Sequence, residues 1–428
     1  MALLRARLGL TGSAGALLGA ILLIGMGQEI AKPFLPKFVS DQASPEWLKA
    51  LVGPGVAPWL PLLLVGLYGT CVDFMEAIYY ATGGRLSGRL GMRRSLLLFT
   101  LLPVAGAAAV AALGTPLALI LAVPFLQGWD AISLPATLTV VGASMPAERR
   151  TLAFSLQAIL RRVPRVLGFL AGGGLVAWLG VVAGVRWAMV AFVVLAVAAL
   201  LVQRRFLSMS EPDKPGGAPL RVRDFPTPLK RLLVSDILAR WCEGLPRDLF
   251  VLMALGSALL PGNAGVCRVS GFEFGALKAE EAAVALLLYL PMGFAASKSG
   301  YAKKPFIGVT FLFFAAFPLA FVLLGPALGL AGFAAAYLVA GLREIGEPAR
   351  KAMITELVPA DLRTRAIGLY WSVRSLAVMA APMTGVLLWI AFGPRAPFYA
   401  AFAFGLAGAL FFWLRFGDDG YHPKPPAS

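Results

Sequence analysis

The sequence has little charge, few cysteines and almost no histidine. Of its 428 residues, 14% are charged and 59% are hydrophobic, and only three are cysteine and one is histidine. About a quarter of the residues of a soluble domain are charged, so the composition argues against one. Cys71, Cys242 and Cys267 are widely spaced and predict neither a disulfide framework nor a metal pair. Because His422 lies in the C-terminal tail, a histidine metal site or a histidine proton relay in a membrane is excluded.

The sequence contains long apolar segments without any charged residue. Ser95–Leu121 and Phe306–Leu342 contain no charged residue, and each is long enough to cross a bilayer. Run length and breaker residues predict twelve spans, and helices are expected because the runs are too long for barrel strands and lack strict alternation. The predicted spans are 11–32, 58–82, 94–113, 117–142, 152–178, 185–204, 230–254, 279–297, 305–325, 328–353, 364–391 and 396–415. The first is interpreted as a retained span, because about 20 apolar residues is long for a signal peptide.

The net charge of +16 is distributed unevenly along the chain. Lys and Arg gather in short connections that fall on one side of the predicted membrane, whereas the opposite turns LGTP (113–116) and LGPALGL (324–330) are uncharged. This distribution is typical of a multi-pass protein of the cell inner (plasma) membrane with both termini cytoplasmic. It does not indicate the basic groove that nucleic-acid binding requires, so no nucleic-acid partner is expected.

One segment is repeated. Residues 145–173 and 358–386 align without a gap at an offset of 213, since 359−146, 374−161 and 385−172 all equal 213. The identical positions are Pro146, Ala147, Arg150, Thr151, Ala153, Leu156, Arg161 and Gly172. A period of half the chain indicates a duplicated unit rather than a solenoid. The predicted domains are therefore an N-terminal bundle (1–206), a cytoplasmic linker (207–229) and a C-terminal bundle (230–428), with the working site where the halves meet.

The connection after the second span reads GRLSGRLGMRR. It resembles the cytoplasmic signature loop of the major facilitator superfamily at Gly84, Arg89, Gly91, Arg93 and Arg94, with Gly88 in place of the family's Asp. The segment GFLAGG (168–173) resembles the family's antiporter motif with Phe169 in place of Pro, and its repeat copy APMTG (381–385) keeps the Pro. PFLQG (124–128) keeps the family's Gln-Gly.

The resemblance implies an all-α membrane fold of twelve transmembrane helices in two pseudo-symmetric six-helix bundles. It also implies a secondary transporter that works by alternating access, with the signature residues as a conformational gating loop. No nucleophile–base pair or metal cluster stands out in the sequence, so neither an enzyme, a cofactor nor a metal site is expected.

The predicted seventh span carries a stripe of alternating charge. Asp236, Arg240, Glu243 and Arg247 are separated by four, three and four residues, which places them within about 60° on one helix face. Neighbours one turn apart can pair. Pro246 is expected to kink this helix and to free backbone carbonyls. Two interpretations stay open, an ion-pair ladder that only holds helices together and a contact with substrate or protons.

Other intramembrane charges extend this set. Arg161 and Arg374 are repeat-equivalent and lie about 15 Å into their spans, so each needs a carboxylate, water or an anionic substrate. Arg343 occupies the repeat position of Asp130, whereas Arg350 and Lys351 are expected to anchor the membrane surface. Aromatic residues beside these charges can contact substrate or pack in the core. The predicted substrate-binding residues are Arg161, Arg240, Glu243, Arg343, Glu347, Arg374 and Trp371.

Carboxylates in the first half suit proton coupling. A carboxylate in a low-dielectric site can gain and lose a proton near neutrality. Asp130, Asp73 and Glu29 are the predicted coupling residues. The alternative is that each carboxylate is permanently ionised against a nearby arginine.

These patterns favour a monomeric, proton-coupled transporter of a small organic compound in a lipid bilayer. Export is favoured over import, on the antiporter-like motif. One alternative is uptake or exchange of an organic anion, motivated by the arginines. Another is a sensor or scaffold that keeps the transporter fold but moves nothing.

Overall fold

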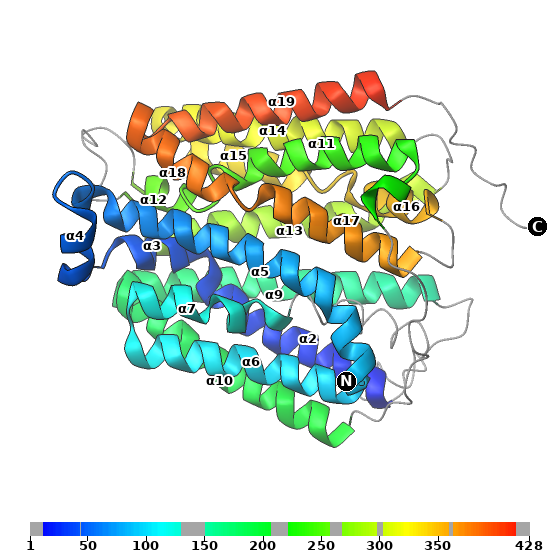
Figure 1. Ribbon diagram of the computed structural model, residues 1–428, viewed down its shortest axis with the longest axis horizontal. Helices are drawn as coiled ribbons and strands as arrows, with labels where there is room; N and C mark the ends of the chain where they lie inside the picture. The colour runs from blue at the N-terminus through cyan, green and yellow to red at the C-terminus, as the bar shows by residue number, and fades with distance from the viewer. Residues whose placement is uncertain are drawn as a thin grey trace, which may run out of the picture. The chain divides into compact units, whose positions relative to one another are not determined.

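The computed structural model describes residues 12–42, 44–129, 150–206, 221–256, 268–297, 303–358 and 363–416, and these residues are almost entirely helical (Figure 1). By spatial proximity the chain falls into two compact units. Unit 1 comprises Met1–Gly53, Ile78–Gly217 and Ser270–Ala279, and unit 2 comprises Pro54–Ala77, Ala218–Val269 and Glu280–Ser428. Each unit is described separately. Because this grouping follows proximity, the predicted boundaries at 206 and 230 stay a prediction.

Unit 1 is a bundle built around the first helix of the chain. α2 packs against α9 and α10, α10 also packs against α6, and α6 packs against α7. These helices run alongside one another in Figure 1. The helices of unit 1 are α2 (Gly12–Ala31), α3 (Leu35–Ser40), α4 (Glu46–Val52), the end of α5 (Leu60–Leu90), α6 (Met92–Leu113), α7 (Pro116–Leu126), α9 (Arg150–Leu179), α10 (Val181–Phe206) and the start of α13 (Gly271–Ser297).

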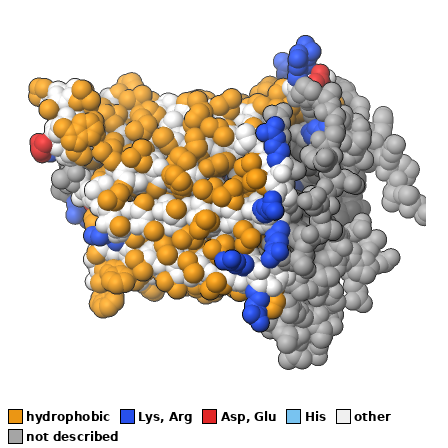
Figure 2. All heavy atoms as spheres, turned by 60° about the horizontal axis from the view of Figure 1, so that its bottom comes forward, with side chains coloured by type: hydrophobic (Ala, Val, Ile, Leu, Met, Phe, Trp, Pro, Cys, Tyr) orange, Lys and Arg blue, Asp and Glu red, His pale blue; other side chains and the backbone are white. Residues whose placement is uncertain are grey.

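The outer surface of α6 and α10 is apolar. Leu101 is 51% exposed and Val194 is 63% exposed, which is unfavourable in water but suits contact with acyl chains. Figure 2 shows a face covered by apolar side chains with a row of Lys and Arg side chains along one margin. Arg93, at the start of α6, donates a hydrogen bond to the carbonyl oxygen of Arg204, near the end of α10, at 3.1 Å, so both basic ends lie together. An apolar band with a basic margin is the surface expected of a membrane protein.

Unit 2 is a second bundle with an aromatic core. α14 packs against α15 and α19, and α11 packs against α19. Phe321 contacts the rings of Phe250, Phe333 and Phe398 at centroid distances of 4.7, 4.8 and 5.6 Å. The helices are the start of α5, α11 (Thr227–Gly244), α12 (Phe250–Leu255), most of α13, α14 (Lys303–Leu328), α15 (Leu330–Leu342), α16 (Glu347–Glu356), α17 (Arg363–Val378), α18 (Ala381–Phe392) and α19 (Ala396–Arg415).

Seven helical segments of the described chain are long and apolar enough to cross a membrane. They are Gly15–Ser40, Ala57–Gly83, Arg93–Leu113, Val181–Phe206, Lys303–Leu328, Arg365–Phe392 and Ala396–Arg415. The protein is therefore an all-α, multi-pass membrane protein, as the hydropathy predicts.

Three predicted spans are interrupted in unit 2. The predicted span 230–254 is divided between α11 and α12, because α11 ends at Gly244, just before Pro246. This confirms the predicted effect of the proline. The predicted span 328–353 is divided between α15 and α16, and α17 and α18 are separated at Met379 and Ala380. The first two interruptions lie next to a buried carboxylate, Asp248 and Glu347.

Two connections differ from expectation. The connection between the predicted spans 11–32 and 58–82 contains the short helices α3 and α4, and the predicted span 279–297 begins earlier, as α13 at Gly271. The signature segment is largely helical as well, because α5 continues to Leu90 and only Gly91 joins it to α6. Gly91 has φ 78°, a left-handed conformation that a glycine adopts without strain.

The repeated glycines set equivalent helix crossings. A Cβ added to Gly172 of α9 would meet the Ile30 carbonyl oxygen at 1.9 Å. A Cβ added to its repeat partner, Gly385 of α18, would meet the Leu245 carbonyl oxygen at the same 1.9 Å. The antiporter-like segment and its copy therefore serve the same purpose in both units, the close approach of two backbones.

Candidate functional site

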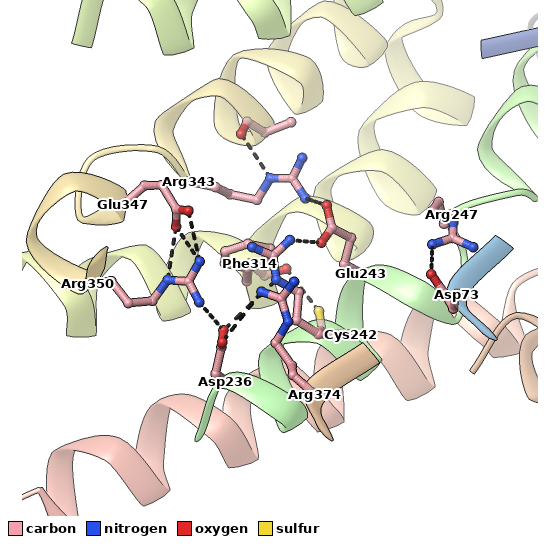
Figure 3. A network of polar contacts seen from close by, with 12 residues as sticks. Asp73, Asp236, Cys242, Glu243, Arg247, Phe314, Arg343, Glu347, Arg350 and Arg374 are labelled. Carbon is pink, nitrogen blue, oxygen red and sulfur yellow. Dashed lines mark hydrogen bonds and ion pairs between the residues drawn. The ribbon is translucent and has the colours of Figure 1, made fainter. Parts of the chain in front are cut away.

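Asp236 is the centre of a buried cluster of charged residues in unit 2. Its side chain extends from α11, and the residue is 1% exposed. Arg350 Nη1 lies 2.5 Å from one carboxylate oxygen, and Arg374 Nη1 lies 3.6 Å from the other. The Tyr370 hydroxyl donates a hydrogen bond to the same carboxylate at 3.2 Å, and Arg240, one turn further along α11, lies at 4.0 Å. Three guanidinium groups thus lie within 4.0 Å of one carboxylate, and Figure 3 shows this carboxylate among its neighbours.

Arg350 is held from two sides. Its Nη2 donates to the two Glu347 carboxylate oxygens at 2.8 and 2.7 Å, across the i, i+3 spacing of α16. Lys351 also reaches Glu347, at 3.3 Å, but its side chain is half exposed. Arg350 is 1% exposed, so its expected role as a surface anchor is wrong. The cause is Asp236, which draws the guanidinium into the bundle.

A second branch of ion pairs continues from Arg240. It forms an ion pair with Glu243, which in turn lies 3.5 Å from Arg343 Nη1. Arg343 Nη2 donates to Glu281 of α13 at 2.5 Å. Figure 3 shows Arg343, at the end of α15, directed toward Glu243 of α11. The eight residues Asp236, Arg240, Glu243, Glu281, Arg343, Glu347, Arg350 and Arg374 are called the Asp236 cluster below.

Aromatic rings flank the arginines of this cluster. The Arg374 guanidinium lies 3.8 Å from the centroid of the Trp371 ring, and that of Arg350 lies at 5.5 Å. Arg343 lies 5.0 Å from the Phe314 ring and 4.9 Å from the Phe317 ring. Such stacking stabilises a guanidinium away from water without neutralising it.

Arg247 belongs to a different group of charges. Because α11 ends at Gly244, Arg247 leaves the predicted stripe and does not pair with Glu243. Its Nη1 lies 2.7 Å from Asp73 of α5, and its Nη2 lies 3.1 Å from the Gly69 carbonyl oxygen and 3.6 Å from Asp248. Asp73 and Asp248 are 5% and 7% exposed. These three charged residues with Gly69 are called the Arg247 site below.

Unit 1 holds the remaining predicted residues that are described. Arg165 Nε of α9 lies 3.2 Å from Glu29 of α2, which is 8% exposed. The signature residues lie at the end of α5 and the start of α6. Asp130 and the side chain of Arg161 lie outside the described residues.

The structure therefore brings together six of the seven predicted substrate-binding residues: Arg240, Glu243, Arg343, Glu347, Arg374 and Trp371. Arg374 has the carboxylate partner that its depth requires. Asp73 and Glu29 each face an arginine elsewhere. Sequence reasoning missed Arg350, Glu281 and Asp248. Glu281 could have been identified as a carboxylate inside an apolar span. Asp248 could not, because its contact with Arg247 depends on the helix break after Gly244.

Fold and site together define a multi-pass α-helical membrane protein that buries paired charges between its helices. The model of the Major Facilitator Superfamily matches residues 17–266. The chain belongs to this superfamily of membrane transporters.

Solved structures show the same fold. A peptide transporter, POT, in complex with sulfate is 15% identical, with a TM-score of 0.69 over 94% of this chain and 93% of that chain. A D-xylose–proton symporter is 15% identical, with a TM-score of 0.68 over 93% and 96%. The human organic anion transporter MFSD10 (TETRAN) is 17% identical, with a TM-score of 0.57 over 94% and 99%. No curated protein matches the sequence significantly. At these identities the likeness concerns the fold alone.

Proposed function

We propose that the protein is a proton-coupled secondary transporter that moves a small organic compound across the cell inner membrane by alternating access. It works as a monomer with both termini cytoplasmic, and its bundles 1–206 and 230–428 rock against one another. The antiporter-like segment of α9 supports export.

The observation that carries this proposal is the Asp236 cluster. Four arginines and four carboxylates lie among apolar helices, and four of them are buried: Asp236, Glu347, Arg350 and Arg374. Burying an ion pair is often no more stabilising than apolar packing. Charges inside a membrane bundle are retained chiefly where they serve substrate or ion pathways. We assign substrate contact to Arg374 and Trp371, with Arg240, Glu243, Arg343 and Glu347 around them. Arg161 is proposed as the equivalent residue in the first half.

Proton coupling is assigned to Asp73 and Glu29, and to Asp130. Asp73 and Glu29 are buried and each has one ion-pair partner among the described residues, Arg247 and Arg165. A carboxylate that releases its arginine during transport can take up a proton in its place. The similarity to a D-xylose–proton symporter supports this chemistry but not a sugar substrate.

Reconstituted vesicles loaded with a pH-sensitive dye test the proposal. Panels of anionic, zwitterionic and cationic organic compounds are added, and the proton movement that each compound induces is recorded. We expect at least one compound to move protons through the protein and to be moved in turn by an imposed proton gradient. Binding without flux under any gradient would instead favour the sensor interpretation.

Uptake or exchange of an organic anion is the second candidate. It is supported by the three guanidinium groups around the Asp236 carboxylate, which can donate hydrogen bonds to an anionic ligand. Exchange of one anion for another would continue after the proton gradient is collapsed with a protonophore, whereas proton-coupled transport would lose its driving force.

A further inference from the structure

The Arg247 site contains more carboxylate than guanidinium. Asp73 approaches Nη1 of Arg247 at 2.7 Å and Asp248 approaches Nη2 at 3.6 Å, so two carboxylates share one cation. With both carboxylates ionised, the three side chains carry a net charge of −1. A buried, uncompensated charge is strongly unfavourable, so the site favours the uptake of one positive charge.

Each carboxylate has a buried oxygen, Oδ2, that accepts no hydrogen bond from any described group, and Oδ2 of Asp248 is also the atom that lies 3.6 Å from Arg247. Buried polar atoms without a partner are rare and call for an explanation. A proton on one of these oxygens would account for it, because the protonated carboxyl group is neutral and its O–H can donate to the other carboxylate.

Both carboxylates are closely packed while the Arg247 side chain is 33% exposed, and the described residues around them add no second cation. A Cβ added to Gly69 would meet Asp248 Oδ2 at 2.1 Å and the Pro382 ring at 2.6 Å, so α5 and α18 close over the carboxylate. α5 also contributes Tyr68 and Glu76, which act electrostatically on this site, and Glu243 faces it from α11. In the described part of the chain, Arg247 is the cation bonded to these carboxylates.

We propose that Asp73 and Asp248 form a shared proton-binding site in which one proton is bound between two carboxylates and Arg247. The proton binds to Oδ2 of one carboxylate, converting COO⁻ to COOH, and neutralises the site. It belongs to the pair rather than to either residue. The role of this site in coupling rests on the proposed transport function, whereas proton binding itself does not.

The position of the bound proton decides which carboxylate Arg247 binds. Asp73 lies on α5 and Arg247 with Asp248 in the turn after α11, so their ion pair joins two segments of unit 2 that are 174 residues apart in the sequence. When the proton is on Asp248, Arg247 is fully committed to Asp73 and to the Gly69 carbonyl. When it moves to Asp73, Arg247 turns to Asp248 and α5 loses its strongest bond to this turn.

Infrared difference spectroscopy of the purified protein, titrated with pH, tests proton binding directly. We expect the wild type to show the carbonyl stretch of one protonated, buried carboxyl group, and Asp73→Asn and Asp248→Asn each to lose it. Arg247→Gln should keep the band to higher pH, because removing the guanidinium favours the protonated form. Asp41→Asn, which removes a carboxylate paired with Lys37, is the matched control and should leave the band unchanged.

Two outcomes would overturn the proposal. One is a band that survives in both Asp73→Asn and Asp248→Asn, or that is absent from the wild type. The other is stabilisation of the wild type against heat by sodium ions with no effect of pH, which would make the site a metal-cation site. Flux assays on the same variants separate the two proposals. Proton-driven flux that persists in Asp248→Asn refutes the coupling role alone, whereas an intact band without any flux refutes transport alone.

Discussion

The Asp236 cluster and the Arg247 site lie on neighbouring turns of the chain but have opposite charge ratios. At Asp236, three guanidinium groups lie within 4.0 Å of one carboxylate. At Arg247, two carboxylates lie within 3.6 Å of one guanidinium group. At the first, Glu347 and Glu243 balance the additional arginines, whereas the second keeps a net negative charge that a cation would neutralise. In our proposals the former contacts substrate and the latter binds a proton, and the break after Gly244 separates them.

The largest expected effect comes from removing the carboxylate that holds the Asp236 cluster together. Asp236→Asn leaves Arg350, Arg374 and Arg240 facing one another without their shared anion. We expect a loss of about 3–5 kcal/mol in the free energy of unfolding, measured by denaturation in detergent.

The matched control is Glu46→Gln. Glu46 pairs with Lys49 on an exposed helix, at 2.7 Å, and should contribute at most about 1 kcal/mol. Equal losses for the two variants would mean that Asp236 contributes no more to the free energy of unfolding than an exposed carboxylate does.

The break between the two regions depends on Gly385. Gly385→Ala would drive a methyl group into the Leu245 carbonyl, within the turn that separates Glu243 from Arg247. We expect a loss of about 1–3 kcal/mol in stability and a similar loss for Gly172→Ala at the equivalent crossing. Gly174→Ala is the control, because nothing lies within 4 Å of its added Cβ and alanine favours a helix. Thermal unfolding that ranks Gly174→Ala with the other two would contradict the crossing role.

The proposed substrate contact of Arg374 predicts a change in selectivity. Arg374→Gln removes one positive charge beside Trp371 and should weaken transport of anionic compounds about tenfold relative to cationic ones, a difference of about 1.4 kcal/mol. Arg374→Lys retains the charge but not the planar stacking, so its effect should be intermediate. Uptake assays with anionic and cationic compounds in parallel measure the ratio. An equal loss for both classes would assign Arg374 a structural role.

The sequence predicted the class and the apolar helices that the structure describes, because these depend on composition and on local periodicity. The effect of Pro246 and the partner of Arg374 also followed from local chemistry. The pairing of Arg247 could not be predicted, since helical periodicity continues the stripe through a turn that the structure breaks. Arg350 was misjudged for a related reason. Its distance from the end of the span suggested the surface, whereas its burial depends on Asp236, more than a hundred residues away in the chain.

The smallest expected effect tests whether Asp236 depends on neutral donors as well as on arginines. Tyr370→Phe removes the hydroxyl that donates to Asp236 at 3.2 Å and leaves the ion pair with Arg350 in place. We expect a loss of about 1 kcal/mol in stability, the usual net contribution of one hydrogen bond. Tyr399→Phe is the control, since Tyr399 is 43% exposed on α19 and should be neutral. If Tyr370→Phe lowered the free energy of unfolding as much as Asp236→Asn, the hydroxyl rather than the arginines would hold the carboxylate. That result would contradict the proposed role of the arginines around Asp236.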